Sequence, residues 1–186
     1  MIVTFSMTTH TDIRLRHTRQ LDAATRATLV ELCTEAYQTD FSRLFFYLPT
    51  DGLHFLTYRD DQIVSHAVVT TRWLQPEARP LLRAAYVAAV ATLPAYQKRG
   101  YASAILRELA ANISDYDIAY LEAGQLAFFQ QLGWERWRGP CFKRSGEQLT
   151  SVPTAQNLLI LRLPRTPRLD LDRTIILESQ AQRITG

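Results

Sequence analysis

The apolar and polar residues at the start of the chain follow first the period of a strand and then the period of a helix. Residues Asp12–Thr18 alternate between apolar and polar types, which predicts a strand with one covered face. Asp22 then occupies a typical N-cap position, and apolar residues recur at helical spacing from Leu29 onward. Together these signals predict an amphipathic helix from Asp22 to about Tyr37.

The middle of the chain carries the strongest strand signals. The aromatic segment Asp40–Tyr47 is compatible with a short helix or a structured loop. Leu53–Arg59 and Gln62–Trp73 are rich in β-branched and aromatic residues and are separated by two aspartates, so they predict a hairpin. Leu81–Leu93 is the most strand-like segment, and it leads into a helix that begins near Tyr101.

The second half of the chain alternates shorter elements with loops. We expect a helix over Tyr101–Leu109, a strand over Asp117–Glu122, a helix over Leu126–Leu132, a loop over Pro140–Pro153, a strand over Leu158–Leu163 and an apolar strand-like stretch at Ile175–Leu177. Helices interleaved with strands predict an α/β (α+β) fold around one sheet. The whole chain, residues 1–186, is expected to form one domain, with a core of about 12–164 and a C-terminal extension over 165–186.

Composition and charge argue against several classes of protein. The chain has 186 residues, 47% of them apolar and 21% charged, with a net charge of +3; disordered chains are less apolar and less balanced in charge. The small net charge gives no support for nucleic acid or membrane partners. The first residues do not resemble a signal peptide, and two cysteines without a CxxC spacing favour a reducing compartment and no metal site. We therefore expect a soluble, cytoplasmic protein.

The segment from Gln97 to Ala102 carries the clearest chemistry. It joins the most strand-like segment to a helix and contains Lys98, Arg99 and Gly100. A glycine lets the backbone turn closely, and the first amides of a helix point outward with the positive end of the helix dipole behind them. With two cations beside them, these amides predict a site for a phosphate or pyrophosphate. The alternative is an ordinary helix start with solvated basic residues; the sequence has neither a GxGxxG nor a Gly-Lys-Ser/Thr phosphate loop.

This segment resembles the acetyl-CoA motif of the GNAT superfamily of N-acetyltransferases. That family's pattern, Gln/Arg-x-x-Gly-x-Gly/Ala, is matched by Gln97, Gly100 and Ala102. Residues 128–134 match a second family feature, an apolar and aromatic helix that ends in Gly-aromatic. Residues 133–140, Gly-Trp-Glu-Arg-Trp-Arg-Gly-Pro, are similar to a motif of the aminoglycoside 2'-N-acetyltransferases. The likeness extends over most of the chain.

The resemblance implies a mixed central sheet that splays apart between its strands 4 and 5, with acetyl-CoA in the gap. The backbones of Val90 and Thr92 would bind the pantetheine, and the backbone N–H near Val90 would act in catalysis by polarising the thioester carbonyl. The cofactor-binding residues implied in this way are Val90, Ala91, Thr92, Gln97, Lys98, Arg99, Gly100, Tyr101, Ala102 and Phe128. The acetyl group would pass directly to an amine. Relatives in this subfamily are commonly dimers, which implies a homodimer.

The chain departs from the subfamily at residues that handle protons and substrate. The subfamily's strand-4 glutamate and its tyrosine near the cofactor sulfur are replaced by Ala88 and Phe129, and Asp40 alone keeps a matching acidic position. A pocket for a polycationic aminoglycoside needs several carboxylates around its ammonium groups. Their loss favours an aminoglycoside with fewer amines, of the kasugamycin type. The resemblance then implies 2'-N-acetylation of such a drug and antibiotic resistance for the host.

Several side chains are candidates for the substrate side of the site. Glu122 ends a strand across the expected splay and is the candidate general base through water, with a solvated glutamate as the equally weighted alternative. Asp40 would anchor a substrate ammonium or cap a short helix. Tyr86 would lie beside the substrate and can donate a proton to the leaving thiolate, although packing explains it as well. Trp137 packs in the core or offers its face to a sugar ring, and His66 is expected to be a packed, hydrogen-bonded histidine.

Two other functions stay open from the residues. The missing Glu and Tyr equivalents leave room for a GNAT acetyltransferase that acts on another small amine or on a peptide. They also leave room for a non-catalytic acyl-CoA-binding module built on the same fold.

Overall fold

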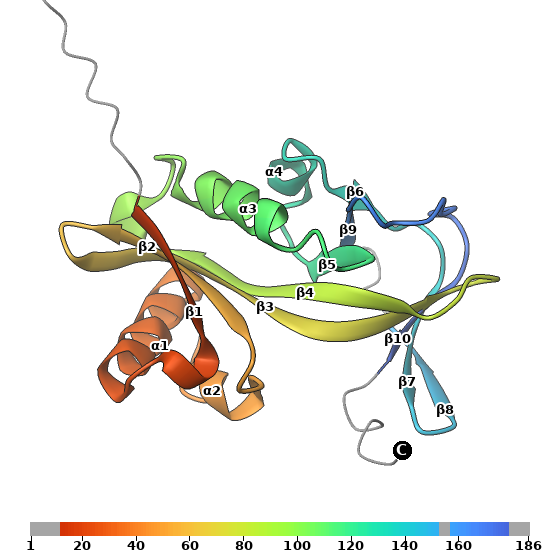
Figure 1. Ribbon diagram of the computed structural model, residues 1–186, viewed down its shortest axis with the longest axis horizontal. Helices are drawn as coiled ribbons and strands as arrows, with labels where there is room; N and C mark the ends of the chain where they lie inside the picture. Colours follow the sequence, from red (N-terminus) through yellow and green to blue (C-terminus); the bar gives the residue numbers. More distant parts are fainter. Residues whose placement is uncertain (1–11, 153–156, 179–186) are drawn as a thin grey trace, which may run out of the picture.

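The part of the chain that the structure describes, residues 12–152 and 157–178, forms a ten-stranded mixed sheet with helices on both of its faces. Figure 1 shows this computed structural model. In chain order its elements are β1 (Asp12–His17), η1 (Thr18–Gln20), α1 (Ala23–Tyr37), α2 (Leu44–Tyr47), β2 (Leu53–Arg59), β3 (Gln62–Pro76), β4 (Leu82–Thr92), η2 (Pro94–Tyr96), α3 (Tyr101–Asn112), β5 (Ile118–Glu122), α4 (Leu126–Gln130), β6 (Glu135–Arg136), β7 (Cys141–Ser145), β8 (Gln148–Ser151), β9 (Leu158–Arg162) and β10 (Ile175–Glu178). The expected α+β fold class is confirmed.

The long strands β3 and β4 form the centre of the sheet. One edge of β3 pairs with β4, and its other edge pairs first with β2 and then with β10. From β4 the sheet continues through β5 and β9 to β6. The predicted hairpin of β2 and β3 is confirmed, and its turn residues Asp60 and Asp61 have φ of 49° and 60°. Two successive positive φ values give the turn a twist that suits a two-residue hairpin.

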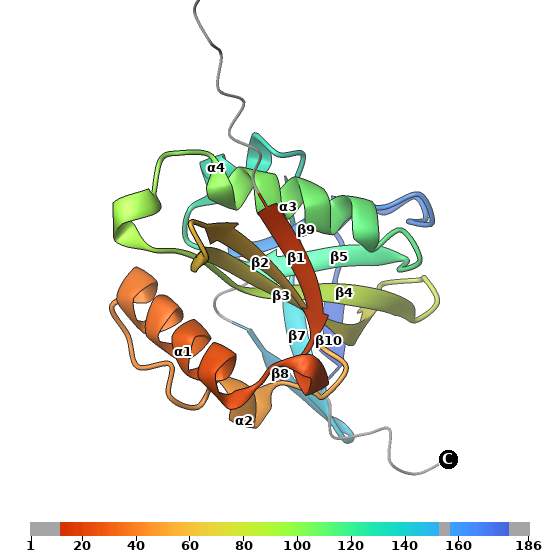
Figure 2. The same ribbon diagram turned by 60° about the vertical axis from the view of Figure 1, so that its left-hand side comes forward.

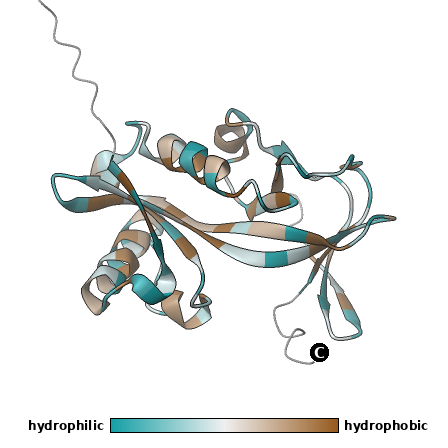
Figure 3. Cartoon of the chain, in the orientation of Figure 1, coloured by the Kyte–Doolittle hydropathy of each residue, from teal (hydrophilic) through white to brown (hydrophobic). Residues whose placement is uncertain are grey.

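Helices cover the sheet from two sides. α3 and α4 lie over one face, and α1 and α2 lie over the other (Figure 1 and Figure 2). Ile105, Leu106 and Leu109 of α3 are buried against the sheet, as are Leu29 and Leu32 of α1. Hydrophobic residues run along the strands and the helix sides, and hydrophilic residues gather at turns (Figure 3). Burial of each such leucine or isoleucine contributes about 1.5–3 kcal/mol, which fixes both helices against β4.

The first long helix begins where the sequence predicts it. The Oδ1 atom of Asp22 accepts a hydrogen bond from the amide of Thr25 at 2.7 Å, and this bond lowers the pKa of Asp22. The cap satisfies one of the amides that a helix start leaves without a partner. The helix runs to Tyr37, and Gln38 then leaves it in a left-handed conformation with φ of 53°. Tyr37 thereby ends up beside β4.

Residues Pro140–Pro153, for which we expected a loop, instead contain the hairpin of β7 and β8. Ser145 pairs with Gln148, so Gly146 and Glu147 form a two-residue turn, and Gly146 has φ of 63°. A glycine at the first turn position suits such a hairpin. The prediction was wrong because β8 is exposed along its whole length, which leaves no alternation of apolar and polar residues to detect.

The strand β10 lies between β3 and β7 and pairs with both of them. Its residues Ile175 and Leu177 are buried in this chain's own core. Both edges of β10 are therefore used within one chain. This apolar stretch is therefore part of the core of its own sheet.

The Gly-Trp-x-x-Trp-x-Gly-Pro segment holds the C-terminal part of the chain in place. Trp137 is 1% exposed, and its indole N–H donates to the carbonyl oxygen of Arg173 at 2.9 Å. The amides of Arg138 and Gly139 both donate to the carbonyl oxygen of Leu171, at 2.8 and 2.9 Å. A Cβ atom at Gly139 would overlap the backbone of Arg173. Of the two alternatives for Trp137, the structure agrees with packing in the core and not with a face offered to a sugar ring.

Candidate active site

The strands β4 and β5 run side by side for only a short distance. They pair in parallel over Ala84–Tyr86 and Ile118–Tyr120. Beyond that point β4 stays paired with β3 as far as Thr92, and β5 stays paired with β9 as far as Glu122. In the described part of the chain no strand lies between these diverging edges, and an open strand edge can bind an extended ligand. The expected splay between strands 4 and 5 is confirmed.

A β-bulge interrupts β4 within this open stretch. Ala88 lies opposite Val68 and Ala91 lies opposite His66, so two residues of β4, Ala89 and Val90, face a single residue of β3. Ala89 has φ of 49°, a left-handed conformation that costs a residue other than glycine about 1–2 kcal/mol. Bulges of this kind redirect the backbone groups of a strand. Here the bulge lies at the wall of the cavity described below.

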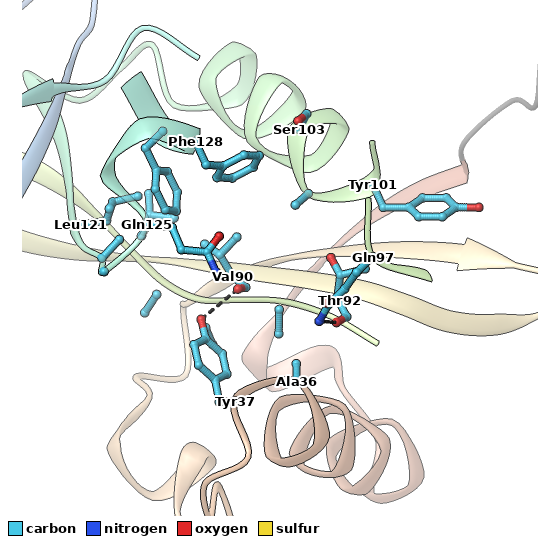
Figure 4. A pocket seen from close by; sticks show the side chains of 18 of the residues that line it. Ala36, Tyr37, Val90, Thr92, Gln97, Tyr101, Ser103, Leu121, Gln125 and Phe128 are labelled. Carbon is cyan, nitrogen blue, oxygen red and sulfur yellow. Dashed lines mark hydrogen bonds between the residues drawn. The ribbon is translucent and has the colours of Figure 1, made fainter. Parts of the chain in front are cut away.

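The hydroxyl of Tyr37 reaches the bulge from the end of α1. It donates a hydrogen bond to the carbonyl oxygen of Val90 at 2.8 Å (Figure 4). Burial on the side of Tyr37 that faces the protein raises the pKa of its hydroxyl to about 12, although 45% of the residue is exposed. The phenol therefore stays protonated near neutral pH and keeps donating.

The loop before α3 presents backbone amides to the same space. The Nε2 atom of Gln97 donates to the carbonyl oxygen of Thr92 at 3.1 Å, and Lys98 and Gly100 have φ of 59° and 86°. No side chain caps α3, and the first amides of a helix have no acceptor within the helix. A Cβ atom on Gly100 would meet no atom within 4 Å, so the space beside these amides is open. Such an arrangement suits an anionic group.

A cavity of about 760 Å³ joins the open edge of β4 to the start of α3, a volume typical of ligand pockets. Figure 4 shows Phe128 of α4 and Tyr37 of α1 on opposite sides of Val90. Among the residues predicted for the site, those that line the cavity are Tyr86, Val90, Ala91, Thr92, Gln97, Lys98, Gly100, Tyr101, Ala102, Glu122 and Phe128. Arg99, predicted with them, is not a lining residue, and its guanidinium lies 5.5 Å from the ring centre of Tyr96, which does line the cavity.

The far rim of the cavity carries groups that can exchange protons. Glu122 is the one carboxylate among the described residues that line the cavity, and it is exposed at the end of β5. The ring of Tyr86 lies 4.9 Å from that of Tyr120. Burial, followed by the nearby charge of Glu122, raises the pKa of Tyr86. The rim thus offers one ionisable acceptor and one neutral phenol.

Asp40 lies outside the cavity, contrary to its predicted role as an anchor for a substrate ammonium. Its Oδ1 atom accepts the amide N–H of Ser42 at 2.8 Å, and its Oδ2 atom accepts the Ser42 hydroxyl at 3.0 Å. These bonds lower the pKa of Asp40. Short polar side chains commonly stabilise turns in this way, and Asp40 shapes the turn before α2.

The two cysteines are structural rather than reactive. Cys33 and Cys141 are free and buried, and burial raises the pKa of Cys33 to about 12 and that of Cys141 to about 11. Both remain thiols at neutral pH, and a thiol is a poor nucleophile. Within residues 12–152 and 157–178, no group of three or more His, Cys, Asp or Glu side chains is arranged to hold a metal ion. No helix in the same residues is long and apolar enough to cross a membrane.

Sequence reasoning missed several residues of the cavity. Tyr37 reaches Val90 from a helix more than 50 positions earlier in the chain, so no local pattern connects the two. Leu121, Ala123 and Gln125 line the wall between β5 and α4. The only available signal was their position beside Glu122 or between Glu122 and Phe128, both of which were predicted for the site.

Comparisons with known proteins agree with this geometry. Residues 17–137 match the family model described as an acetyltransferase (GNAT) domain. The chain is also similar to an aminoglycoside 2'-N-acetyltransferase from Mycolicibacterium fortuitum, with 28% identity over 165 residues. That match covers 87% of this chain and 84% of the relative.

Solved structures share the fold at low sequence identity. A GNAT family N-acetyltransferase from Escherichia coli, YhbS, whose structure was determined in complex with CoA, superposes with a TM-score of 0.63 at 14% identity, over 90% of this chain and 88% of that one. Eis1 from Mycobacterium abscessus superposes with a TM-score of 0.60 at 18% identity. It covers 71% of this chain, and the match spans only 33% of Eis1.

Proposed function

The chain belongs to the GNAT acetyltransferase family, and we propose that it transfers an acetyl group from acetyl-CoA to the 2' amine of an aminoglycoside. The observation that carries this proposal is the cavity in which the open edge of β4 meets the uncapped start of α3. The Mycolicibacterium fortuitum relative, named for action at a 2' amine, supports the acceptor.

The residues of the cavity fit the cofactor. The amides at the start of α3 and the charge of Lys98 would hold its diphosphate. The main chain from Val90 to Thr92 would bind the pantetheine amides along the open edge of β4, and Phe128 would contact its apolar part. When bound, acetyl-CoA supplies the acetyl group as a thioester. The CoA complex of YhbS supports this placement on a shared fold.

The roles of the chain's own groups follow from where they lie. The backbone N–H of Val90 would donate to a carbonyl oxygen that becomes negative during transfer. Glu122 would receive the proton of the acceptor amine, directly or through water. Tyr86, held as a neutral phenol beside it, would donate to the leaving sulfur. The hydroxyl of Tyr37 holds the carbonyl oxygen of Val90, on the peptide that follows this N–H.

The charge of the cavity favours a particular kind of aminoglycoside. Among the described residues that line it, Glu122 alone carries a carboxylate, and Lys98 adds a positive charge. Each ammonium group taken out of water needs a compensating partner. We therefore propose a kasugamycin-like acceptor with few amines in preference to a polycationic drug such as gentamicin, and antibiotic resistance as the consequence for the host.

A thiol-release assay on the purified protein tests the proposal. Acetyl-CoA is supplied with kasugamycin, gentamicin, tobramycin, a polyamine or a peptide amine, and the acetylated position is assigned by mass spectrometry and NMR. We expect turnover of kasugamycin above that of the other two drugs, with the acetyl group on the 2' amine. Equal turnover of the three drugs would refute the substrate preference. Turnover of only the polyamine or peptide would show that the acceptor is another kind of amine. CoA binding without any turnover would indicate a non-catalytic module.

A further inference from the structure

A chain of buried hydrogen bonds runs through the strands and ends at the β4 bulge. The Oγ1 atom of Thr18 lies 3.0 Å from Nε2 of His54, and Nδ1 of His54 lies 2.9 Å from Nε2 of His66. Nδ1 of His66 lies 3.0 Å from the carbonyl oxygen of Ala89. Both histidines are 0% exposed and Thr18 is 3% exposed. The chain thus links the end of β1 through β2 and β3 to the wall of the cavity.

The carbonyl oxygen of Ala89 fixes the direction of the two hydrogen bonds that the histidines donate. Because a carbonyl can only accept, Nδ1 of His66 carries a proton. Burial lowers the pKa of His66 to about 4, so its ring is neutral and Nε2 must accept from Nδ1 of His54. Burial also lowers the pKa of His54 to about 3, so its Nε2 is an acceptor for the Thr18 hydroxyl, which donates to the carbonyl oxygen of Gly52 at 3.2 Å as well. Both histidine donors therefore point toward the bulge.

The hydrogen bonds from Thr18 to Ala89 are surrounded by apolar side chains. Phe45 stacks on His54 with ring centres 5.9 Å apart, and the sulfur of Cys33 lies 3.9 Å from Nδ1 of His66. Leu56 and Ala91 belong to the same buried cluster. Buried polar groups cost free energy unless all of them are paired, and apolar side chains would fill this core without that cost. We therefore explain these buried hydrogen bonds by their effect on the carbonyl of Ala89, which the last of them holds.

The last bond of the chain controls one peptide unit. The carbonyl of Ala89 and the N–H of Val90 belong to the same planar trans peptide, so they point in opposite directions. A donor that holds the carbonyl on the His66 side therefore aims the N–H of Val90 to the other side. A hydrogen bond to the carbonyl also polarises that N–H and strengthens it as a donor. This N–H belongs to the bulge at the cavity wall.

We propose that His66, oriented by His54 and Thr18, is a positioning residue that aims and polarises the Val90 N–H for the transferring acetyl group. The inference rests on the proposed function, because the Val90 N–H has this task only when acetyl-CoA lies along β4. His66 itself touches neither substrate, and it acts through the peptide between Ala89 and Val90. Its loss affects the rate of transfer more than the binding of CoA.

Two amide variants of His66 form a matched pair for the test. In His66→Asn the side-chain N–H₂ takes the place of Nδ1 and can still donate to the carbonyl of Ala89. In His66→Gln the amide extends to the place of Nε2 and faces His54 instead. We expect kcat to fall about tenfold or more in His66→Gln, in line with the cost of impairing an oxyanion donor, and to stay near the wild-type value in His66→Asn. The Kd for CoA, measured by calorimetry, stays near the wild-type value in both.

A readout independent of activity accompanies the kinetics. The amide resonance of Val90 is followed in ¹⁵N-labelled protein with and without CoA. We expect His66→Asn to keep the wild-type position of this resonance and His66→Gln to move it. Identical Val90 resonances in all three proteins would overturn the inference, as would equal kcat in the two variants. If His66→Gln does not fold, His66→Leu removes the same Nδ1 donor at similar side-chain volume, and an unchanged Val90 resonance there would equally overturn it. Failure of the wild type to bind CoA would instead refute the proposed function.

Discussion

The hydroxyl of Tyr37 and the carbonyl oxygen of Val90, 2.8 Å apart, join the end of α1 to the bulge of β4. The preceding carbonyl, that of Ala89, is held by His66 at 3.0 Å. Two successive carbonyls of the bulge are therefore fixed by side chains from other elements. Such support can maintain the left-handed conformation of Ala89, whose cost the surrounding structure must offset.

Removal of the Tyr37 hydroxyl tests this support directly. In Tyr37→Phe the carbonyl of Val90 loses its donor, and a typical hydrogen bond contributes about 1 kcal/mol. We expect kcat/KM for the acceptor amine to fall about fivefold. The free energy of unfolding, measured in urea, changes little because water in the cavity can bind the freed carbonyl. An unchanged kcat/KM would show that the bulge does not depend on this bond.

Replacement of Glu122 tests its proposed role as the base. Glu122→Gln keeps the size of the side chain but cannot take a proton from the amine, so we expect kcat/KM to fall by about 10². Glu147→Gln, in the remote turn between β7 and β8, is the matched control and keeps the wild-type profile. A rate of Glu122→Gln equal to wild type across the pH range would remove Glu122 from the mechanism.

The buried histidine pair predicts a loss of stability in acid. Burial lowers the pKa of His54 to about 3 and that of His66 to about 4, from an ordinary value of 6.5. As pH falls from 6.5 toward 4, the unfolded chain binds protons that the folded chain does not, so the free energy of unfolding falls. Each pKa unit corresponds to about 1.4 kcal/mol, which gives a loss of several kcal/mol for the pair.

Urea unfolding of the wild type and of His66→Asn, at a series of pH values from neutral to acidic, measures this effect. We expect a steep decline for the wild type below the ordinary histidine pKa and a shallower one for the variant, which has one buried titrating group fewer. Parallel curves for the two proteins would be inconsistent with a neutral His66 in the folded chain.

Replacement of Gly139 is expected to lower the free energy of unfolding strongly without changing any residue of the cavity. In Gly139→Ala the new Cβ overlaps the backbone of Arg173, so the segment that holds β10 must move, and we expect a loss of more than about 3 kcal/mol. Gly124→Ala, where a Cβ meets no atom within 4 Å, is the control and costs little. Equal urea midpoints for the two variants would contradict a docking role for the tryptophan segment.

The cofactor side of the site could be predicted from the sequence because its chemistry is local. The loop from Gln97 to Ala102 presents the first backbone amides of a helix and a glycine with positive φ, and both leave a signature in consecutive residues. The splay of β4 and β5 was predicted from the family resemblance and not from the residues themselves. The bulge at Ala89 in the open part of β4 carries no sequence signal, since alanine has no preference for the left-handed conformation.

The acceptor side could not be predicted in the same way because it is assembled across the sheet. Tyr37 matters only through its contact with Val90, and His66 only through its contacts with His54 and Ala89. Matching by position did not place Asp40 at the cavity: its two oxygens accept hydrogen bonds from Ser42 in the turn before α2. Trp137 lies in a motif similar to that of the subfamily, and here its indole N–H binds the carbonyl oxygen of Arg173 in the C-terminal part of the chain.

Calorimetric titration of CoA into the wild type, Gly100→Ala and Gly146→Ala tests the central proposal most directly. Both glycines have positive φ, 86° and 63°, so both substitutions impose a similar backbone cost of about 1–2 kcal/mol, but only Gly100 adjoins the start of α3. We predict that the wild type and Gly146→Ala bind CoA with the same Kd and that Gly100→Ala binds it about tenfold or more weakly. No uptake of CoA by the wild type, or equal affinity in all three proteins, would contradict a diphosphate site at these amides.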